Sequence, residues 1–489
     1  MRPPHVARAM NAARRTRASD LRSPGGVGGS GGERPHLATR GQLFPAHGGP
    51  AEAPALGAAP SPKAKRRDDL RALRAAAVDL HPFDAGRGQA SRIHQCGRTV
   101  IGGSVADAFV GRPADAGAAS SVYGAQSCGR AWECAVCRAR IGAMHLEELT
   151  ACVDYWLDRP GSGRVYFLTL TVRHSSRDEL EGLRRGLSRS WSRLVEGRAW
   201  QDFKVKNDAH FVRAFDATLG PAGWHVHFHA LLFVRDALDT HETKRMLFER
   251  WSRIVARELG EDAVPSRAHA VRLQTMKGRD ELPKYVAKLG MELTNDLGKG
   301  HDEEADAIGG FTPWELLAEL GYLRRRAREA QTAGEAELAR ELNAESAELA
   351  GAWHAWRLGM HGAKWVTWSK NLRALAGLSA ELTDEQAAAL EDEEPECIAR
   401  IPMELRKVVL YHPSLVATLL DAADRGLPLA PFVDATLGAV DAAIWHEAND
   451  PSRLAEWYAA RPAELAEWHA ERKAARAAAK AARAAESES

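Results

Sequence analysis

Three histidines alternate with apolar residues in the segment WHVHFHALLFV, and this pattern constrains the fold more than any other feature of the chain. Because the side chains of a β-strand alternate between two faces, His225, His227 and His229 project from the same face of one strand. Histidine is the commonest metal ligand in proteins. A solvent-facing polar stripe is the alternative, but the apolar neighbours Phe228 and Leu231 argue against it. The pattern predicts a metal site on a β-sheet.

The segments around the histidine strand predict an α+β core. RVYFLTLTV is rich in β-branched and aromatic residues, which is typical of a strand, and HAVRLQTM is expected to form a further strand. HFVRAFDATLG ends in a turn between Gly220 and Gly223, so it most simply forms a hairpin with the histidine strand. Apolar residues recur at helical spacing in RDELEGLRRGLSRSWSRLV and TKRMLFERWSRIVAREL. Strands and helices therefore interleave within this core.

A tyrosine lies beside two charged residues in the segment ELPKYVAKL. The spacings of four and three residues place Glu281, Tyr285 and Lys288 on one face of a helix. Taken alone, this group is typical of an ordinary surface helix with a half-buried tyrosine. Beside a metal-binding strand, the same phenol, carboxylate and ammonium form a set suited to nucleophilic chemistry.

Clustered cysteines predict a second metal site. Cys128, Cys134 and Cys137 lie within ten residues, and the two-residue gap between the last two is the usual chelating spacing. A closed structural zinc site needs a fourth thiolate or imidazole, and Cys96 in IHQCGRT is the natural one, with His94 as its competitor. Buried free cysteines are the alternative.

Cysteine usage and hydropathy indicate where such a chain works. Six cysteines in 489 residues are too few for a disulfide scaffold, so we expect a reducing compartment and a cytoplasmic location. Cys152 and Cys397 lie outside the cluster and are expected to be ordinary thiols. The sequence contains no run of about 18 uncharged apolar residues, so a membrane role is disfavoured.

Taken in order, three motifs resemble those of the HUH-type rolling-circle replication initiators of actinobacterial plasmids and integrative elements. The shared motifs are YFLTLT at 166–171, HFHALL at 227–232 and YVAK at 285–288. The cysteine segment CGRAWECAVCRARI, FTPWELL at 311–317 and WVTWSKNLR at 365–373 also resemble landmarks of this family. The resemblance covers roughly residues 90–375 and leaves both ends of the chain outside it.

The resemblance assigns a role to each candidate residue. It implies an HUH endonuclease core, an antiparallel sheet with flanking helices, in which His227 and His229 bind a divalent ion, magnesium or manganese. Tyr285 would be the nucleophile, Lys288 would support the phosphate, and Glu281 matches the acid found four residues before the tyrosine in one branch. On this reading His225 is a candidate third metal ligand.

Two positions depart from the family's pattern. Val226 stands where relatives often have proline, which we expect to be harmless. Leu289 stands where many relatives have a second tyrosine, so the chemistry would depend on one tyrosine. If Glu281 activates a water late in the cycle, a second cleavage can release the product without a second tyrosine.

The resemblance implies that the protein nicks one DNA strand at a rolling-circle origin, forming a 5′-phosphotyrosine link and a free 3′ hydroxyl that primes synthesis. Its substrate would be single-stranded or hairpin origin DNA, bound partly through phosphate contacts. A host helicase and a polymerase would be its partners.

Three other classes of protein share some of these features. An HUH transposase would show much the same residues, although the WSKNLR landmark favours replication. A conjugative relaxase usually places its tyrosine ahead of the histidines, whereas here it follows them. A non-catalytic zinc-dependent DNA-binding regulator would explain the cysteines, but it leaves the histidine face and Tyr285 unexplained.

The expected organisation has six parts. Gly, Pro, Ala and Arg dominate the start of the chain, which is typical of disorder, and 381–396 is strongly acidic, which is typical of a linker. The parts are a disordered tail at 1–88, a cysteine-rich zinc module at 89–150, the HUH nuclease domain at 151–300, a helical accessory region at 301–378, an acidic linker at 379–398 and a helical C-terminal region at 399–489.

Overall fold

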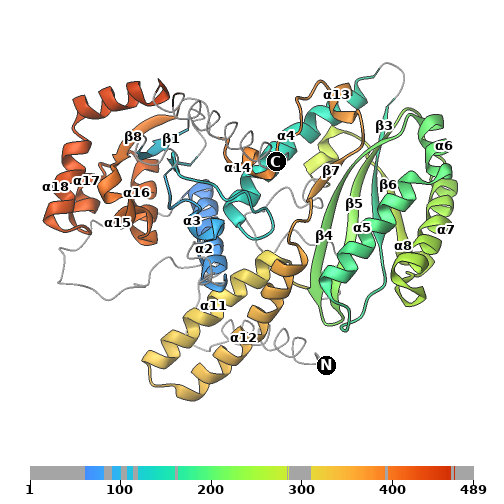
Figure 1. The fold of residues 1–489 in the computed structure, drawn as a ribbon, viewed down its shortest axis with the longest axis horizontal. Helices are drawn as coiled ribbons and strands as arrows, with labels where there is room; N and C mark the ends of the chain where they lie inside the picture. The colour runs from blue at the N-terminus through green and yellow to red at the C-terminus, as the bar shows by residue number, and fades with distance from the viewer. Residues whose placement is uncertain are drawn as a thin grey trace, which may run out of the picture. The chain divides into compact units, whose positions relative to one another are not determined.

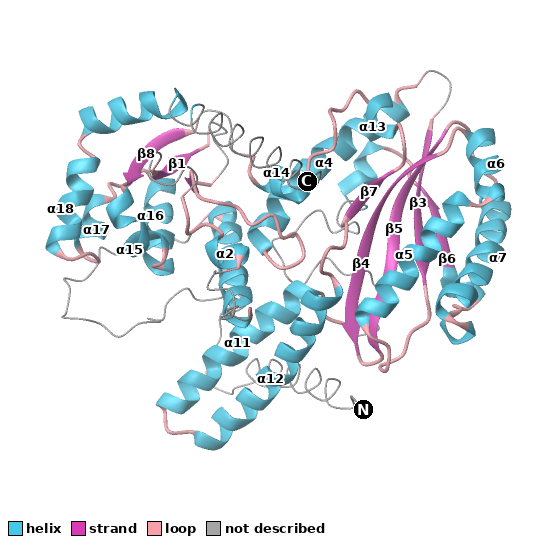
Figure 2. Cartoon of the chain, viewed as in Figure 1, coloured by secondary structure: helices cyan, strands magenta, loops and turns pink. Residues whose placement is uncertain are grey.

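The computed structural model describes residues 61–81, 91–100, 107–113, 119–159, 163–283, 285, 310–390, 395–463 and 467. The chain divides into two compact units, one centred on residues 129–388 and one on 83–128 with 389–489. Both units combine helices with antiparallel strands, as Figures 1 and 2 show. The expected α+β class is confirmed.

An antiparallel five-stranded sheet organises the first unit, in the order β6-β3-β5-β4-β7. The strands predicted from the sequence are confirmed, including the β4–β5 hairpin, in which Gly220 pairs with Gly223. Gly223 has a φ of +95°, which favours glycine at this turn. Strand β7 was not predicted, because a three-residue strand is too short to show an alternating pattern. The bounds are β3 Arg164–Thr171, β4 His210–Gly220, β5 Gly223–Val234, β6 Val271–Thr275 and β7 Val366–Trp368.

Two amphipathic helices cover one face of this sheet (Figure 1). The apolar side of α5, Leu180–Glu196, places Trp191 against Phe228 of β5, with ring centroids 5.5 Å apart. From α7, Thr240–Leu259, Trp251 Nε1 donates a hydrogen bond to the backbone oxygen of Thr171. Both helices were predicted from the helical spacing of their apolar residues, and both predictions are confirmed.

Helix α4, Ala135–Leu157, packs on the opposite face near the end of β5. Its Trp156 ring lies 5.7 Å from that of Phe233 and donates a hydrogen bond to Val234 O. Two long helices, α11 Pro313–Thr332 and α12 Ala336–Gly359, pack against each other, and α12 also contacts α5. The shorter elements are α6 Arg198–Asn207, η1 Glu261–Ala263, α8 Arg267–Ala270, η2 Arg279–Glu281, α13 Leu372–Leu375 and α14 Asp384–Ala388.

The second unit contains a small sheet in the order β2-β1-β8. It packs with short helices around an apolar core that includes Val110, Leu419 and Trp445. The bounds are α3 Arg92–Gln95, β1 Ala108–Arg112, β2 Ser121–Tyr123, β8 Glu396–Ile401, η3 Met403–Leu405, α15 Arg406–Leu410, α16 Pro413–Asp424, α17 Ala430–Asp434 and α18 Ala439–Ala448.

Strand β8 differs from the expected order of an acidic linker followed by helices only. It begins inside 379–398 and pairs with β1, so segments about 290 positions apart in the sequence form one sheet. Helix α14 also lies in the expected linker, where the Thr383 hydroxyl caps the backbone N–H of Gln386. The acidic composition predicts neither element. For β8 the reason is that charge says little about pairing with a distant strand.

Helix α2, Pro62–Leu80, differs from the expected disordered tail at 1–88. Leu73, Ala77 and Val78 recur at helical spacing and are buried. His81 follows the helix and lies 3.1 Å from Glu133, Nε2 to Oε2. Alanine and arginine are strong helix formers. The prediction of disorder rested on the overall glycine and proline content of 1–88 and did not consider this segment separately. The remainder of that expected tail, 1–60 and 82–88, lies outside the described residues.

A mostly buried ion pair joins α4 to α13. Arg373 Nη2 lies 2.5 Å from Glu148 Oε1, and His145 Nδ1 lies 3.3 Å from Glu148 Oε2. Burial alone would raise the pKa of Glu148, but hydrogen bonds from Arg373 and His145 outweigh it and lower that pKa to about 2. The ionised carboxylate is therefore favoured in the folded state.

We expect Glu148→Gln to lower the free energy of unfolding of the first unit by roughly 2–3 kcal/mol at neutral pH, because Arg373 loses its buried partner. A carboxyl with a lowered folded-state pKa stabilises above its ordinary value near 4.5, and the effect is lost as the pH falls towards about 2. Urea unfolding at pH 7 and pH 3 measures both. Glu181→Gln, in an exposed pair with Arg185, is the control and should change stability little. An equal loss in both variants would contradict the assignment.

Candidate active site

Two histidines and an aspartate converge at the centre of the five-stranded sheet. His227 and His229 lie on the central strand β5, and Asp216 lies directly opposite His227 on β4. The two Nε2 atoms are 2.8 Å apart, and Asp216 Oδ2 lies 3.2 Å from His227 Nε2 and 3.8 Å from His229 Nε2. These three atoms are oriented towards a common point and could hold one metal ion.

Neighbouring groups on β3 and β4 fix the orientation of this ligand set. The Thr169 hydroxyl lies 3.1 Å from His229 Nδ1, which leaves Nε2 facing the aspartate. The ring of Phe167 stacks on His229 at 5.1 Å, and the backbone N–H of Ala217 donates to Asp216. Burial would raise the pKa of Asp216, but the hydrogen bond and the electrostatic interaction with His227 outweigh it and hold that pKa well below its usual range. Two imidazoles with an ionised carboxylate suit a divalent cation.

His225 does not join this group. Its ring lies between those of His227 and His174, with centroids 5.2 and 5.1 Å away. Burial, then the electrostatic interaction with His227, lowers the pKa of His225 to about 3, so its imidazole is neutral. The structure brings Asp216 to the position expected of a third ligand. The hairpin turn could have revealed this aspartate, because pairing Gly220 with Gly223 sets Asp216 opposite His227.

Tyr285 is buried beside this group, with only 2% of its surface exposed. Its ring stacks on Phe167 at 4.8 Å, and Phe167 in turn contacts His229, so one aromatic ring connects the phenol with the ligand set. Lys288, the third member of the predicted helical face, lies outside the described residues.

Glu281 interacts directly with the phenol of Tyr285. The phenol is hydrogen-bonded to this carboxylate, which also accepts the backbone N–H of Lys277 at 2.7 Å. Burial, then the negative charge of Glu281, raises the pKa of Tyr285 above its ordinary value. The folded protein therefore holds a neutral phenol next to a proton acceptor.

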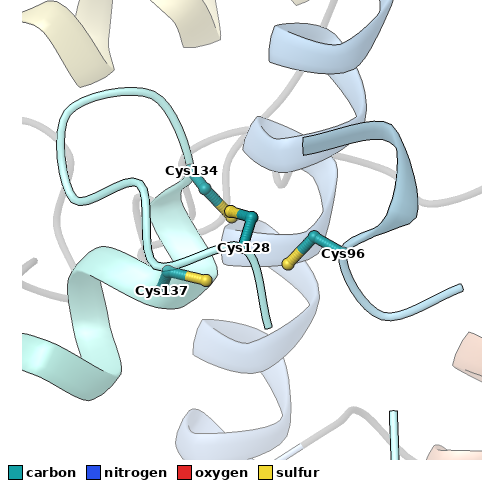
Figure 3. A group of neighbouring side chains, drawn as sticks. All are labelled: Cys96, Cys128, Cys134 and Cys137. Atoms are coloured by element: carbon teal, nitrogen blue, oxygen red, sulfur yellow. The ribbon is translucent and has the colours of Figure 1, made fainter. Parts of the chain in front are cut away.

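Four cysteines form a second group, shown in Figure 3. Cys96 follows α3, Cys128 follows β2, and Cys134 and Cys137 lie at the start of α4. All four are buried, with sulfur atoms within 4.8 Å of one another. His94, the competing fourth ligand, is 2.8 Å from the Ser91 hydroxyl and is not part of the group. Four thiols in this arrangement could hold a tetrahedral metal ion.

The two remaining cysteines behave as ordinary thiols. Cys152 is buried and Cys397 half-buried, and neither belongs to the group of four. Burial raises the pKa of each thiol to about 12, so both stay protonated and unreactive near neutral pH.

Comparisons with known proteins place these residues in context. Residues 119–304 match the family described as "Replication protein". "Protein rep" of Streptomyces lividans is 27% identical over 315 residues, covering 54% of this chain and 67% of that protein. Proteins of the same name from Lentilactobacillus hilgardii and Lactiplantibacillus plantarum are 28% and 26% identical, and each match covers 33% of this chain and 54% of the relative.

No solved structure is significantly similar to the chain. Among the described residues, none of the helices has the length and apolar character needed to cross a membrane.

Proposed function

Because residues 119–304 match the replication protein family, we propose that this chain initiates plasmid replication by nicking one strand of origin DNA with Tyr285. One observation carries the proposal. The matched segment contains the converging group of Asp216, His227 and His229, and it also contains a buried tyrosine that is separated from this group by a single aromatic ring. A regulator that only binds DNA has no need of either.

The ligand set would supply the electrophilic part of the reaction. A divalent ion such as magnesium or manganese, held by Asp216, His227 and His229, would withdraw charge from a phosphate oxygen as a Lewis acid. The protein's contribution is orientation. Adjacent rigid strands carry the three ligands, and Thr169 fixes which nitrogen of His229 faces the site.

Tyr285 and Glu281 would supply the nucleophile and its base. The phenol oxygen attacks phosphorus, its proton passes to the hydrogen-bonded Glu281, and the bond from phosphorus to the 3′ oxygen breaks. The departing 3′ oxygen takes up the proton from Glu281, so the products are a 5′-phosphotyrosine link, a free 3′ hydroxyl that a polymerase can extend, and an ionised Glu281. The raised pKa of Tyr285 makes such a base necessary, because little phenolate exists near neutral pH.

A second cleavage would end the cycle. Because Leu289 stands where many relatives carry another tyrosine, a water molecule is the available nucleophile. Glu281 would accept a proton from that water as its oxygen attacks phosphorus, the bond from phosphorus to the Tyr285 oxygen would break, and the departing phenolate would take the proton from Glu281. In this scheme one carboxylate acts in both cleavages, and Lys288 would support the phosphate, as the family resemblance implies.

The substrate would be unpaired DNA at the origin, either single-stranded or extruded as a hairpin. Asp216, His227 and His229 lie on one face of the sheet, so the scissile linkage would have to be reachable from that face. A host helicase and polymerase would act on the nicked product.

A nicking assay tests this function. Labelled single-stranded DNA from the origin, and in a separate reaction from the ends of a mobile element, is incubated with the full chain and manganese, and a denaturing gel is scored for a shorter strand and a protein-linked strand. The proposal requires both products and their loss in EDTA. DNA binding without either product would instead indicate a regulator, and covalent joining confined to the ends of a mobile element would indicate a transposase.

We also propose that Cys96, Cys128, Cys134 and Cys137 hold a structural zinc ion. Zinc held by four thiolates contributes folding free energy directly, of order 10 kcal/mol in small zinc domains. The cysteines adjoin the start of α4, whose Trp156 packs under the central sheet, so the ion would secure that helix.

We expect the double variant Cys134→Ser, Cys137→Ser to lose its zinc and to become sensitive to proteolysis around α4. Mass spectrometry of the metal content gives the zinc per chain, and limited proteolysis gives the site of unfolding. Cys397→Ser, outside the group, is the control and should retain zinc. Wild-type protein purified without stoichiometric zinc would refute this assignment.

A further inference from the structure

Strand β6 forms an edge of the central sheet and carries an unusual charge pattern. Residues 264–277, which contain β6 and the short helix before it, include Arg267, Arg272 and Lys277 but no aspartate or glutamate. Nothing in the proposed mechanism uses these cations. Cations in such a segment, beside the proposed nuclease site, could bind phosphate groups of the DNA.

The strand register decides which of these cations faces the metal ligands. Thr169 of β3 pairs with His229 on one side and with Arg272 on the other. Residues directly opposite each other in antiparallel strands project from the same face, and the contact between Thr169 and His229 identifies that face. Arg272 therefore lies on the ligand face, two strands from His229, with about 10 Å between the Cα atoms.

The side chains of β6 alternate between the two faces of the sheet. Leu273 projects to the opposite face and is buried, whereas Arg272 is exposed. Gln274, the next residue on the ligand face, pairs with Phe167, whose ring stacks on Tyr285. Arg272 and Gln274 thus form a short polar strip beside the metal ligands and the nucleophile.

We propose that Arg272 binds a phosphate of the DNA strand next to the scissile one, and that the strand crosses the ligand face towards β6. Its planar guanidinium offers two parallel N–H donors to one phosphate, which fits a positioning contact better than a point charge would. The long side chain can span much of the distance from β6 to the ligand group. This inference rests on the proposed nicking function and adds the path of the substrate.

Equilibrium binding tests the contact without cleavage. In EDTA, Arg272→Ala should weaken binding of single-stranded origin DNA roughly fivefold to tenfold and reduce the slope of log K against log salt concentration by about 1. Arg272→Lys should restore the slope but only part of the affinity. The control is Arg257→Ala, which removes an exposed arginine from α7 on the covered face of the sheet.

Substituted DNA identifies the phosphate. Oligonucleotides with one methylphosphonate each, at successive positions around the nick, should weaken wild-type binding at several positions. At the contacted phosphate, Arg272→Ala should bind the substituted and the natural strand equally. In nicking assays the same variant should raise KM and leave kcat nearly unchanged.

The outcomes separate the two proposals. If wild-type protein does not nick, the proposed function fails, while the binding arm still measures the Arg272 contact. Normal nicking by wild type together with unchanged affinity, salt slope and KM in Arg272→Ala would overturn the inference alone. An equal loss in Arg257→Ala would overturn it as well, since the effect would then reflect general charge.

Discussion

Tyr285→Phe is expected to reduce strand cleavage by about a thousandfold or more and to eliminate the covalent protein–DNA product. The substitution removes the phenol oxygen, which is the proposed nucleophile, and keeps the ring that stacks on Phe167. Losing one buried hydrogen bond to Glu281 should cost about 1 kcal/mol, so the fold should persist. Denaturing gels with labelled origin DNA measure cleavage, and thermal unfolding measures stability.

Tyr166→Phe provides a matched control. Its hydroxyl is also buried and accepts a hydrogen bond from the backbone N–H of Leu238 at 2.8 Å, so the same oxygen is lost from the same sheet. Tyr166 projects from the face opposite the ligands, because it alternates with Phe167 along β3. We expect this variant to cleave normally. Adduct formation by the Tyr285 variant at the wild-type rate would refute the nucleophile.

Changing the three converging ligands is expected to have the second-largest effect. His227→Ala, His229→Ala and Asp216→Asn should each lower cleavage by about a hundredfold or more, because each removes or neutralises a ligand atom of the group. Binding of DNA should change much less, since phosphate contacts and metal chemistry are separate contributions. Titration with manganese measures the loss, and the Asp216 variant should need more metal.

His225→Ala is the control for these ligands. Its ring lies beside His227 but outside the group of three, so its loss should reduce activity only mildly. Wild-type activity in the His227 and His229 variants would contradict the metal site. A loss in His225→Ala as large as theirs would mean that this imidazole is the third ligand in place of Asp216.

The central sheet could be predicted largely from the sequence because its long strands contain strong local signals. β3, β4 and β5 have 8, 11 and 12 residues and include several β-branched and aromatic residues each, and glycines define the hairpin between the last two. β7 and β8 could not be predicted in this way. They have three and six residues and pair with strands far away in the sequence, so local periodicity carries little information about them.

The candidate site was only partly predictable for a similar reason. His227 and His229 stand out because histidine is unusual in an apolar strand, and the cysteines stand out by spacing. Asp216 lies on another strand, and a single aspartate in a half-buried strand has no distinctive pattern of its own. Only the hairpin register connects it with the histidines. The contact between Glu281 and Tyr285 follows from their helical spacing, but the stacking of Tyr285 on Phe167 needs the tertiary fold.

Mapping the protein–DNA link tests the central claim most directly. Wild-type protein is reacted with single-stranded origin DNA and manganese, the adduct is digested with nuclease and protease, and the modified peptide is sequenced by mass spectrometry. We predict a nucleotide attached through phosphate to Tyr285 and to no other tyrosine. Attachment at Tyr166 or Tyr322, or cleavage without any covalent peptide, would contradict the proposed mechanism.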